Sequence, residues 1–208
     1  FQASAVSYLY YADRIYQINL AIAGIAIGTV ILPNLSKHIK TGNKKKINFI
    51  QNKSFELCLF LSLPASMALV VGAEEITSAL FGYGVFNELS VSNSAKALFY
   101  FALGLPAFAI IKVFSAFLFA RGNTKTPFYF SLISVLINIS ISIFFFKEVG
   151  FIIIPIATSI SSWVNALLLF IKLNLNNNFK ARNIFNNTNL KITLVSIISI
   201  YIFNFFIN

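Results

Sequence analysis

Two adjacent charged residues, Asp13 and Arg14, interrupt an apolar stretch near the start of the 208-residue chain. The run Ser-Tyr-Leu-Tyr-Tyr-Ala of residues 7–12 precedes them, and the later segment 21–32 carries no charge. A charged side chain inside a membrane-spanning helix costs about 3 kcal/mol, so it is expected to face protein or water and to have a function. Arg14 is therefore the residue whose role has to be explained.

Ser7 and Gln17 stand seven residues before and three residues after Arg14. These spacings place all three side chains on one face of a helix. Adjacent residues of a helix point about 100° apart, so Asp13 is a poor ion-pair partner for Arg14. Ser7, Asp13, Arg14 and Gln17 are thus candidate substrate-binding residues. The alternatives are an ion pair or snorkelling for Arg14, and hydrogen bonds between helices for Ser7 and Gln17.

Lys112 is a second charge within an apolar stretch, residues 107–114. It lies about nine residues before Arg121, which marks a helix end, and this depth is too great for easy snorkelling. We predict that Lys112 is a buried charge and a further candidate for substrate binding.

Composition identifies the surroundings of these helices. The chain is 58% hydrophobic and 11% charged, and its mean hydropathy is +0.80. A soluble domain has about 25% charged residues, so the chain belongs in a lipid bilayer. Long uninterrupted apolar runs favour helices over barrel strands, so the predicted class is an all-α polytopic membrane protein. His38 stands in a basic loop and no carboxylate pair, metal cluster or nucleophile arrangement is apparent, so we do not expect an enzyme.

Six apolar stretches are candidate membrane spans, and a crossing takes about 20 helical residues. The first is too long for one straight crossing, and Gly24, Gly28 and Pro33 are places where it can bend or end. A short segment, residues 74–81, is expected at the membrane interface. The six predicted spans cover residues 4–35, 47–72, 92–120, 128–146, 151–173 and 192–206.

The basic residues alternate from one connecting loop to the next. The second and fourth loops carry most of the acidic residues, whereas the first, third and fifth are basic. By the positive-inside rule the three basic loops are cytoplasmic. The net charge of +10 therefore comes from basic residues in alternate loops of a membrane topology, and it does not indicate nucleic-acid binding. The basic residues that lie in or flank these three loops are Lys37, Lys40, Lys44, Lys45, Lys46 and Lys53, then Arg121 and Lys125, then Lys172, Lys180, Arg182 and Lys191.

Several motifs occur in an order that resembles one known family, the MurJ (MviN) lipid II flippases of bacterial peptidoglycan synthesis. They are Ser-Tyr-Leu-Tyr-Tyr-Ala-Asp-Arg at 7–14, Gly-Thr-Val-Ile-Leu-Pro-Asn-Leu-Ser-Lys at 28–37, Leu-Phe-Gly-Tyr-Gly-Val-Phe at 80–86, Lys-Val-Phe at 112–114, Ala-Arg-Gly-Asn-Thr-Lys-Thr-Pro at 120–127, and Pro-Ile-Ala-Thr-Ser-Ile-Ser-Ser-Trp-Val-Asn-Ala-Leu-Leu at 155–168.

The resemblance implies the C-terminal lobe of a two-lobed, 14-helix transporter related to MATE-like exporters. Residues 1–173 would hold helices 8 to 12 of the family, 174–191 a basic cytoplasmic loop, and 192–208 helix 13. The N-terminal lobe, helix 7 and helix 14 would be absent. The implied partners are lipid II, membrane lipids and the N-terminal lobe, and the implied place is the bacterial inner membrane. No bound cofactor is implied, while the membrane potential or a cation gradient could drive transport.

The resemblance also assigns roles to single residues. Arg14 matches a cavity arginine of the family and would bind the diphosphate of lipid II, and Ser7 matches a cavity residue. The chain departs from the family at Gln17, where some relatives carry Glu, and at Asn19, where Pro is common. Both the charge balance and the bend of this helix are thereby altered.

The resemblance also implies a site for a sodium-type cation. Asn138, Ser142 and Thr158 would supply its oxygen atoms, but the family has an aspartate where this chain has Ser142. Hard cations prefer oxygen ligands with some negative charge, so these residues could instead form hydrogen bonds between helices. Two other functions stay open: a MATE-like exporter of another polyprenyl-linked saccharide or of drugs, and a membrane protein that does not transport.

Overall fold

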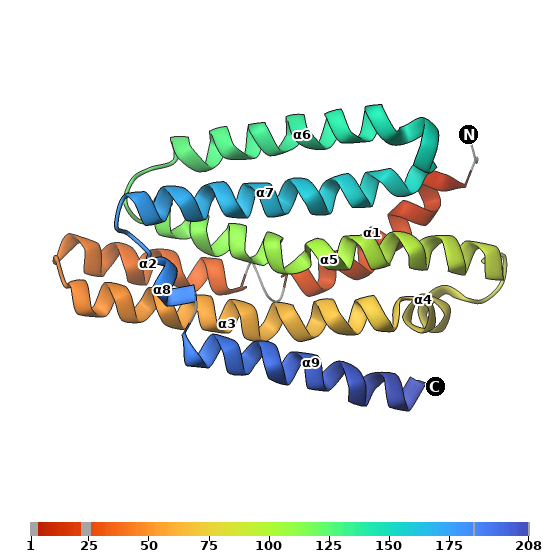
Figure 1. The fold of residues 1–208 in the computed structure, drawn as a ribbon, viewed down its shortest axis with the longest axis horizontal. Coiled ribbons are helices and arrows are strands. Elements are labelled where there is room, and N and C mark those ends of the chain that lie inside the picture. Colours follow the sequence, from red (N-terminus) through yellow and green to blue (C-terminus); the bar gives the residue numbers. More distant parts are fainter. Residues whose placement is uncertain (1–3, 22–25, 185, 208) are drawn as a thin grey trace.

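The computed structural model describes residues 4–21, 26–184 and 186–207, and these form a bundle of helices joined by short turns (Figure 1). No strand occurs within those ranges, which confirms the predicted all-α class. The helices are α1 (Ala5–Leu20), α2 (Ala26–Lys40), α3 (Lys44–Val71), α4 (Ala73–Phe81), α5 (Glu88–Phe119), α6 (Lys125–Val149), α7 (Ile153–Leu175), α8 (Ala181–Ile184) and α9 (Asn187–Ile207), with a 3-10 turn at Gly150–Ile152 between α6 and α7.

Three helical stretches are long and apolar enough to cross a membrane: Lys44–Val71, Glu88–Phe119 and Lys125–Leu175. The third contains two helices, α6 and α7, which turn back on each other at Gly150, where φ is +74°. Glycine adopts this left-handed conformation without the steric penalty of other residues. A polytopic membrane protein is therefore confirmed.

The predicted spans agree with the observed helices within a few residues, except for the first. Residues 4–35 form two helices, α1 with 16 residues and α2 with 15. The predicted bend at Gly24 lies outside the described residues. α2 continues through Gly28 and Pro33, because a proline removes one backbone hydrogen bond and need not end a membrane helix.

α5 forms the centre of the bundle. It packs against α1, α2, α3, α4 and α7, and 72% of its most apolar segment is buried. One apolar cluster around Phe114 and Phe117 joins α5 to α2, α3 and α7, and a second around Leu98 and Leu105 joins α5 to α1 and α3. α6 packs mainly on α7, and most of its apolar side chains are exposed. That exposed face is suited to lipid.

The backbone of α5 is interrupted by Pro106, which has no N–H to donate to the carbonyl oxygen of Ala102. The hydroxyl of Ser66, on α3, donates to that oxygen at 2.6 Å. From α7, the Ser159 hydroxyl donates to the carbonyl of Tyr100, and Trp163 Nε1 donates to that of Leu103 at 3.0 Å. Neighbouring helices therefore satisfy the backbone around the proline, as membrane helices require.

A close contact between α5 and α7 depends on Gly104. A Cβ atom at this position would lie 2.7 Å from Ser159 Oγ and 3.1 Å from Ser159 Cα. The absence of a side chain lets the two backbones approach, as is common where membrane helices pack.

The connections fall at two ends of the bundle (Figure 1). The α2–α3, α5–α6 and α7–α9 connections, which carry the basic loops, lie at one end, called the basic end below. The α3–α5 connection, the α6–α7 turn and the C-terminal end of α9 lie at the other. The three predicted basic loops therefore share one end, although the side of the membrane they face is still a prediction.

Candidate functional site

The position of α1 is set by its apolar side. Ala12, Ile15 and Tyr16 are buried against α5, and the ring of Tyr16 packs on those of Phe101 and Phe108 at 5.5 and 5.6 Å between centroids. The opposite side of α1 faces away from the bundle. Its exposed polar residues are Ser7, Tyr10, Arg14 and Gln17, called the α1 polar row below.

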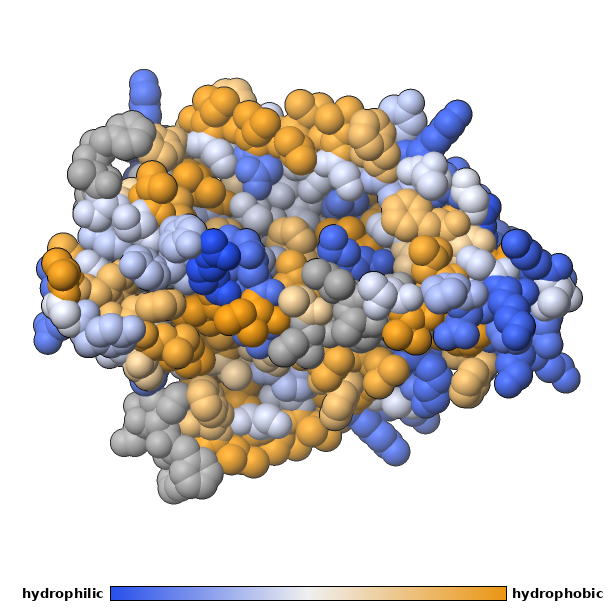
Figure 2. Space-filling view, turned by 180° about the vertical axis from the view of Figure 1, so that it is seen from behind, coloured by the Kyte–Doolittle hydropathy of each residue, from blue (hydrophilic) through white to orange (hydrophobic). Residues whose placement is uncertain are grey.

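The predicted shared face of Ser7, Arg14 and Gln17 is thus present, and Tyr10 belongs to it as well. Sequence reasoning missed Tyr10, although its spacing of four residues from Arg14 is the spacing of neighbours on a helix. Figure 2, which views the bundle from behind, shows hydrophilic side chains near the middle of the face, below the apolar band of α6. The bundle therefore presents a polar region among apolar surfaces.

Arg14 has a partner in its own helix. Its Nη2 donates to the hydroxyl of Tyr10 at 2.8 Å, and its guanidinium carbon lies 4.7 Å from the centre of the Tyr10 ring. No ion pair within 4 Å links Arg14 to Asp13 in the described part of the chain. Tyr10 thus holds the exposed guanidinium while other donors stay free for a ligand.

Asp13 is half-buried and bonds to the next turn instead. The side-chain amide of Gln17 donates to Asp13 Oδ2. Asn19, the position where the family commonly has Pro, donates from its Nδ2 to the carbonyl of Ile15 at 3.1 Å. Neutral Gln17 therefore serves Asp13 as a donor, which a glutamate could not do while ionised.

Lys112 does not lie where the sequence predicted it. Its side chain is exposed and lines a groove of about 660 Å³, with Thr29 and Leu32 of α2 on one side and Pro127 and Ser131 of α6 on the other. The prediction of a buried charge was wrong because α2 and α6 leave this face of α5 open. Lys112 and Arg14 therefore both lie on the surface of the bundle, on different helices.

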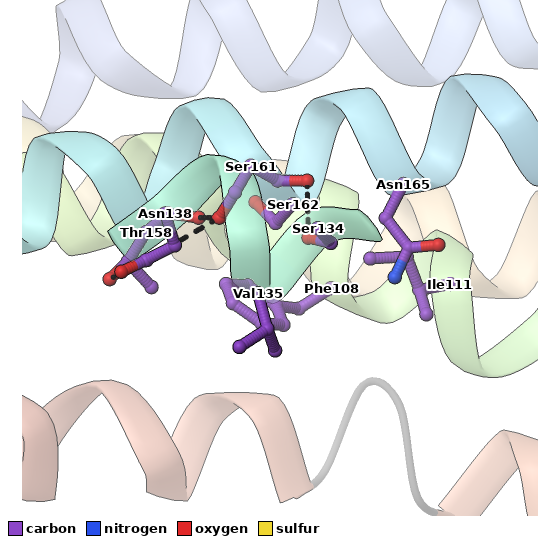
Figure 3. Close-up of a pocket in the computed structure, with 9 residues that line it drawn as sticks. All are labelled: Phe108, Ile111, Ser134, Val135, Asn138, Thr158, Ser161, Ser162 and Asn165. Carbon is purple, nitrogen blue, oxygen red and sulfur yellow. Dashed lines mark hydrogen bonds between the residues drawn. The ribbon is translucent and has the colours of Figure 1, made fainter. Parts of the chain in front are cut away.

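A polar cavity of about 250 Å³ lies between α5, α6 and α7 (Figure 3). Ser134 Oγ donates to the carbonyl of Ser161 at 2.7 Å, and Asn138 Nδ2 donates to Thr158 Oγ1 at 3.0 Å. Sequence reasoning identified Asn138 and Thr158 but missed Ser134, Ser161 and Asn165. The spacing of Ser134 and Asn138, four residues apart on an apolar helix, was the signal available.

The predicted cation site does not fit the observed arrangement. Asn138 and Thr158 come together, and the Asn138 amide Nδ2 donates to Thr158 Oγ1. Ser142 does not line the cavity, and its buried hydroxyl has no hydrogen-bond partner in the structure described. The described residues contain no cluster of three metal-ligating His, Cys, Asp or Glu side chains. Neutral groups already bonded to each other make a poor site for a hard cation.

Comparisons with known proteins point to one family. A family model described as lipid II flippase MurJ matches residues 1–207. The probable lipid II flippase MurJ of Rhizobium meliloti is 45% identical over 166 residues, 80% of this chain and 31% of the relative. That of Rickettsia prowazekii is 38% identical over 170 residues, 82% of this chain and 34% of the relative.

A solved structure titled lipid II flippase MurJ, inward closed conformation, is similar to this one, with a TM-score of 0.82 and 29% sequence identity. The match covers 97% of this chain and 41% of the other. The chain spans about a third of the length of the curated relatives it matches.

Proposed function

The chain belongs to the MurJ family of lipid II flippases, and we propose that it forms one lobe of a carrier that moves lipid II from the cytoplasmic to the periplasmic leaflet of the bacterial inner membrane. The α1 polar row is the observation that carries this proposal. It is an exposed row of polar groups with a guanidinium, on a bundle whose other faces are largely apolar.

The chemistry of the cargo explains why such a row is needed. Lipid II carries a saccharide–peptide head joined by a diphosphate to a polyprenyl tail. Taking this anionic head through hydrocarbon unaided would leave its charges and hydrogen-bonding groups without water, at a cost of many kcal/mol. A carrier instead offers a polar cavity between two lobes that opens to one side and then to the other. The α1 polar row would form part of one cavity wall.

Each candidate residue has a proposed task in this wall. Arg14 would bind the diphosphate through its forked donors, with Tyr10 holding the guanidinium in place. Ser7 and the Asp13–Gln17 pair would hydrogen-bond to the polar head. Lys112 would add a second positive charge from the groove beside α2 and α6. No bond of the cargo is broken, so no catalytic residue is required.

The proposed architecture follows the family. Residues 1–173 would correspond to helices 8 to 12, residues 174–191 to a basic cytoplasmic loop and residues 192–208 to helix 13. An N-terminal lobe would supply the facing wall. We propose no bound cofactor, with the membrane potential or a cation gradient as the driving force. Asn138, Ser142 and Thr158 as arranged here do not support a cation site in this lobe.

A chimera tests the proposed cargo. In the Rhizobium meliloti relative, the matching segment is replaced by this chain, and the chimera is expressed in cells of that species depleted of their own MurJ. Growth should be restored, and lipid II should become accessible at the outer leaflet. A chimera that is abundant in the membrane but leaves lipid II inside would favour the other cargo classes, another polyprenyl-linked saccharide or drugs.

The orientation of the lobe in the membrane can be tested separately from its cargo. Because the basic end carries most of the positive charge, residues 37–46 and 174–191 should face the cytoplasm and residues 74–88 the periplasm. Single cysteines at Lys45 and Glu88, with Cys58 replaced by serine, are probed in whole cells with a membrane-impermeant thiol reagent. Labelling is expected at position 88 only. Labelling at position 45 without labelling at 88 would reverse the orientation.

A further inference from the structure

The basic end contains a cavity of about 510 Å³ that the transport proposal does not use. Residues of the first, third and fifth loops meet there. Three cationic side chains line it, Lys44, Arg121 and Lys180, one from each loop. The amide side chains of Asn48 and Asn183 line it as well. The loops are remote in the sequence, so their meeting is a property of the fold.

A buried aromatic anchor holds the fifth loop in place. Phe179 is only 1% exposed, and its ring lies 5.5–5.6 Å from the rings of Phe55, Phe114 and Phe117. Asn177 just before it adopts a φ of +53°, the left-handed conformation that ends α7. The loop is therefore packed into the bundle core, and Lys180 is fixed beside the first turns of α3.

Among the described residues the cations of the cavity have no carboxylate partner, although Arg121 has a backbone partner: its Nη1 donates to the carbonyl of Phe117 at 2.7 Å. The one ion pair in the described part of the chain joins Lys53 to Glu56, so Lys44, Arg121 and Lys180 have no carboxylate within 4 Å. Burial lowers the pKa of the half-buried Arg121 guanidinium from its ordinary value, as expected for a charge without a counter-charge. The N-terminus of α3, which begins at Lys44, adds its partial positive charge. An anion would relieve this electrostatic repulsion.

A buried amide lies on the helix that carries the lining residues Lys44, Ile47 and Asn48. Gln51 lies one helical turn below Ile47, a lining residue, on the same side of α3. Its side chain is fully buried, and neither its Oε1 nor its Nε2 has a hydrogen-bond partner in the structure described. This amide is therefore a polar group inside the bundle, one helical turn from the cavity lining.

The place of the cavity along the bundle fits the headgroup layer of a membrane. The turn between α2 and α3 reaches past the ends of α6 and α7 (Figure 1), so the cavity lies where the apolar bundle gives way to the basic loops. Hydrophilic side chains gather at this end, on the right of Figure 2. Phe49 and Leu175, close in sequence to lining residues, are exposed and apolar. They provide apolar surface at the same end of the bundle as the cavity.

We propose that this cavity binds the phosphate headgroup of an anionic membrane lipid, held by Lys44, Arg121 and Lys180. Such a lipid would join the first, third and fifth loops at the membrane surface. The site is separate from the α1 polar row, and its occupation does not depend on the cargo of the carrier.

The test uses the 208-residue chain purified in a nonionic detergent and measures retention of radiolabelled phosphatidylglycerol. Retention should exceed that of phosphatidylcholine with the same acyl chains about fivefold, because only the former has a net negative charge. The double variant Lys44→Gln/Lys180→Gln should bind phosphatidylglycerol about tenfold more weakly, since each basic residue near an anionic lipid contributes measurably. Lys44→Arg/Lys180→Arg keeps the charges and should bind like the unchanged chain.

The matched control is Lys45→Gln/Lys191→Gln, which removes the same charge from exposed positions outside the cavity. It should change retention less than twofold. Equal losses in the two glutamine variants would overturn the proposal, because they would show attraction to net charge alone. Retention of phosphatidylcholine equal to that of phosphatidylglycerol would also overturn the proposal. Displacement of phosphatidylglycerol by millimolar inorganic phosphate would overturn it as well, because free phosphate would then be the ligand. Circular dichroism of each variant confirms that the helices are intact.

Discussion

Arg14→Ala in the chimera should abolish lipid II flipping while the amount of protein in the membrane stays unchanged. The side chain lies on the exposed side of α1 and, among the described residues, its hydrogen bond is to Tyr10, so its removal should not disturb the packing of α1 on α5. Arg14→Lys should keep the charge but lose the fork, and a lost charged hydrogen bond of about 1.5–3 kcal/mol corresponds to about a 10- to 100-fold slower rate. Flipping and membrane abundance are measured together for both variants.

Two controls separate binding from anchoring. Lys96→Ala removes an exposed cation from α5 at the end opposite the basic loops and should leave flipping within about twofold, since scattered surface charges contribute little. Tyr10→Phe keeps the ring and loses only the hydroxyl that accepts from Arg14, so a reduction of a few fold is expected. If Arg14 were a topological anchor, lysine would replace it fully. Full activity of Arg14→Ala at normal abundance would remove this residue from the mechanism.

These 208 residues reconstituted alone in vesicles should flip lipid II no faster than protein-free vesicles. The α1 polar row has no facing wall within the described residues, and alternating access requires one lobe to move against another. The chimera, in the same vesicles, should flip the cargo. A fluorescent lipid II analogue and a quencher of the outer leaflet measure both rates.

The vesicle comparison needs proof that the chain is inserted and helical, from circular dichroism and flotation with the lipid. Flipping by these residues alone, removed by Arg14→Ala, would show that a single lobe or its self-association suffices. That result would contradict the two-lobed architecture while leaving the role of Arg14 intact.

The sequence was sufficient to predict the helices and the polar row, because apolar runs and helical spacing are local properties. The second to sixth predicted spans agree with α3, α5, α6, α7 and α9, and Ser7, Arg14 and Gln17 share one face as expected. Which face a neighbour covers is not a local property. Lys112 looked buried because its sequence neighbours are apolar, yet α2 and α6 leave its side of α5 open.

The polar cavity shows the same limit. Thr158 and Asn138 lie 20 residues apart in the sequence, and only the antiparallel packing of α6 on α7 brings them within a hydrogen bond. The sequence indicates which residues carry polar side chains, but it does not indicate which partner the Asn138 amide binds. The convergence of Lys44, Arg121 and Lys180 likewise depends on Phe179 entering the core, which spacing along the chain does not indicate.

Pro106 is a position at which the central helix α5 could bend. The hydrogen bonds around it restrict that bending. Ser66 on one side and Ser159 and Trp163 on the other hold the carbonyls of three residues within one turn of α5. Bending α5 there would break bonds to α3 and to α7 at once, leaving polar groups without partners in a medium that offers no water. Hydrogen bonds from α3 and from α7 therefore hold α5 in place around the proline. In the transport cycle proposed above, the bundle would therefore turn as one rigid piece, and the motion would occur at the contact between the lobes.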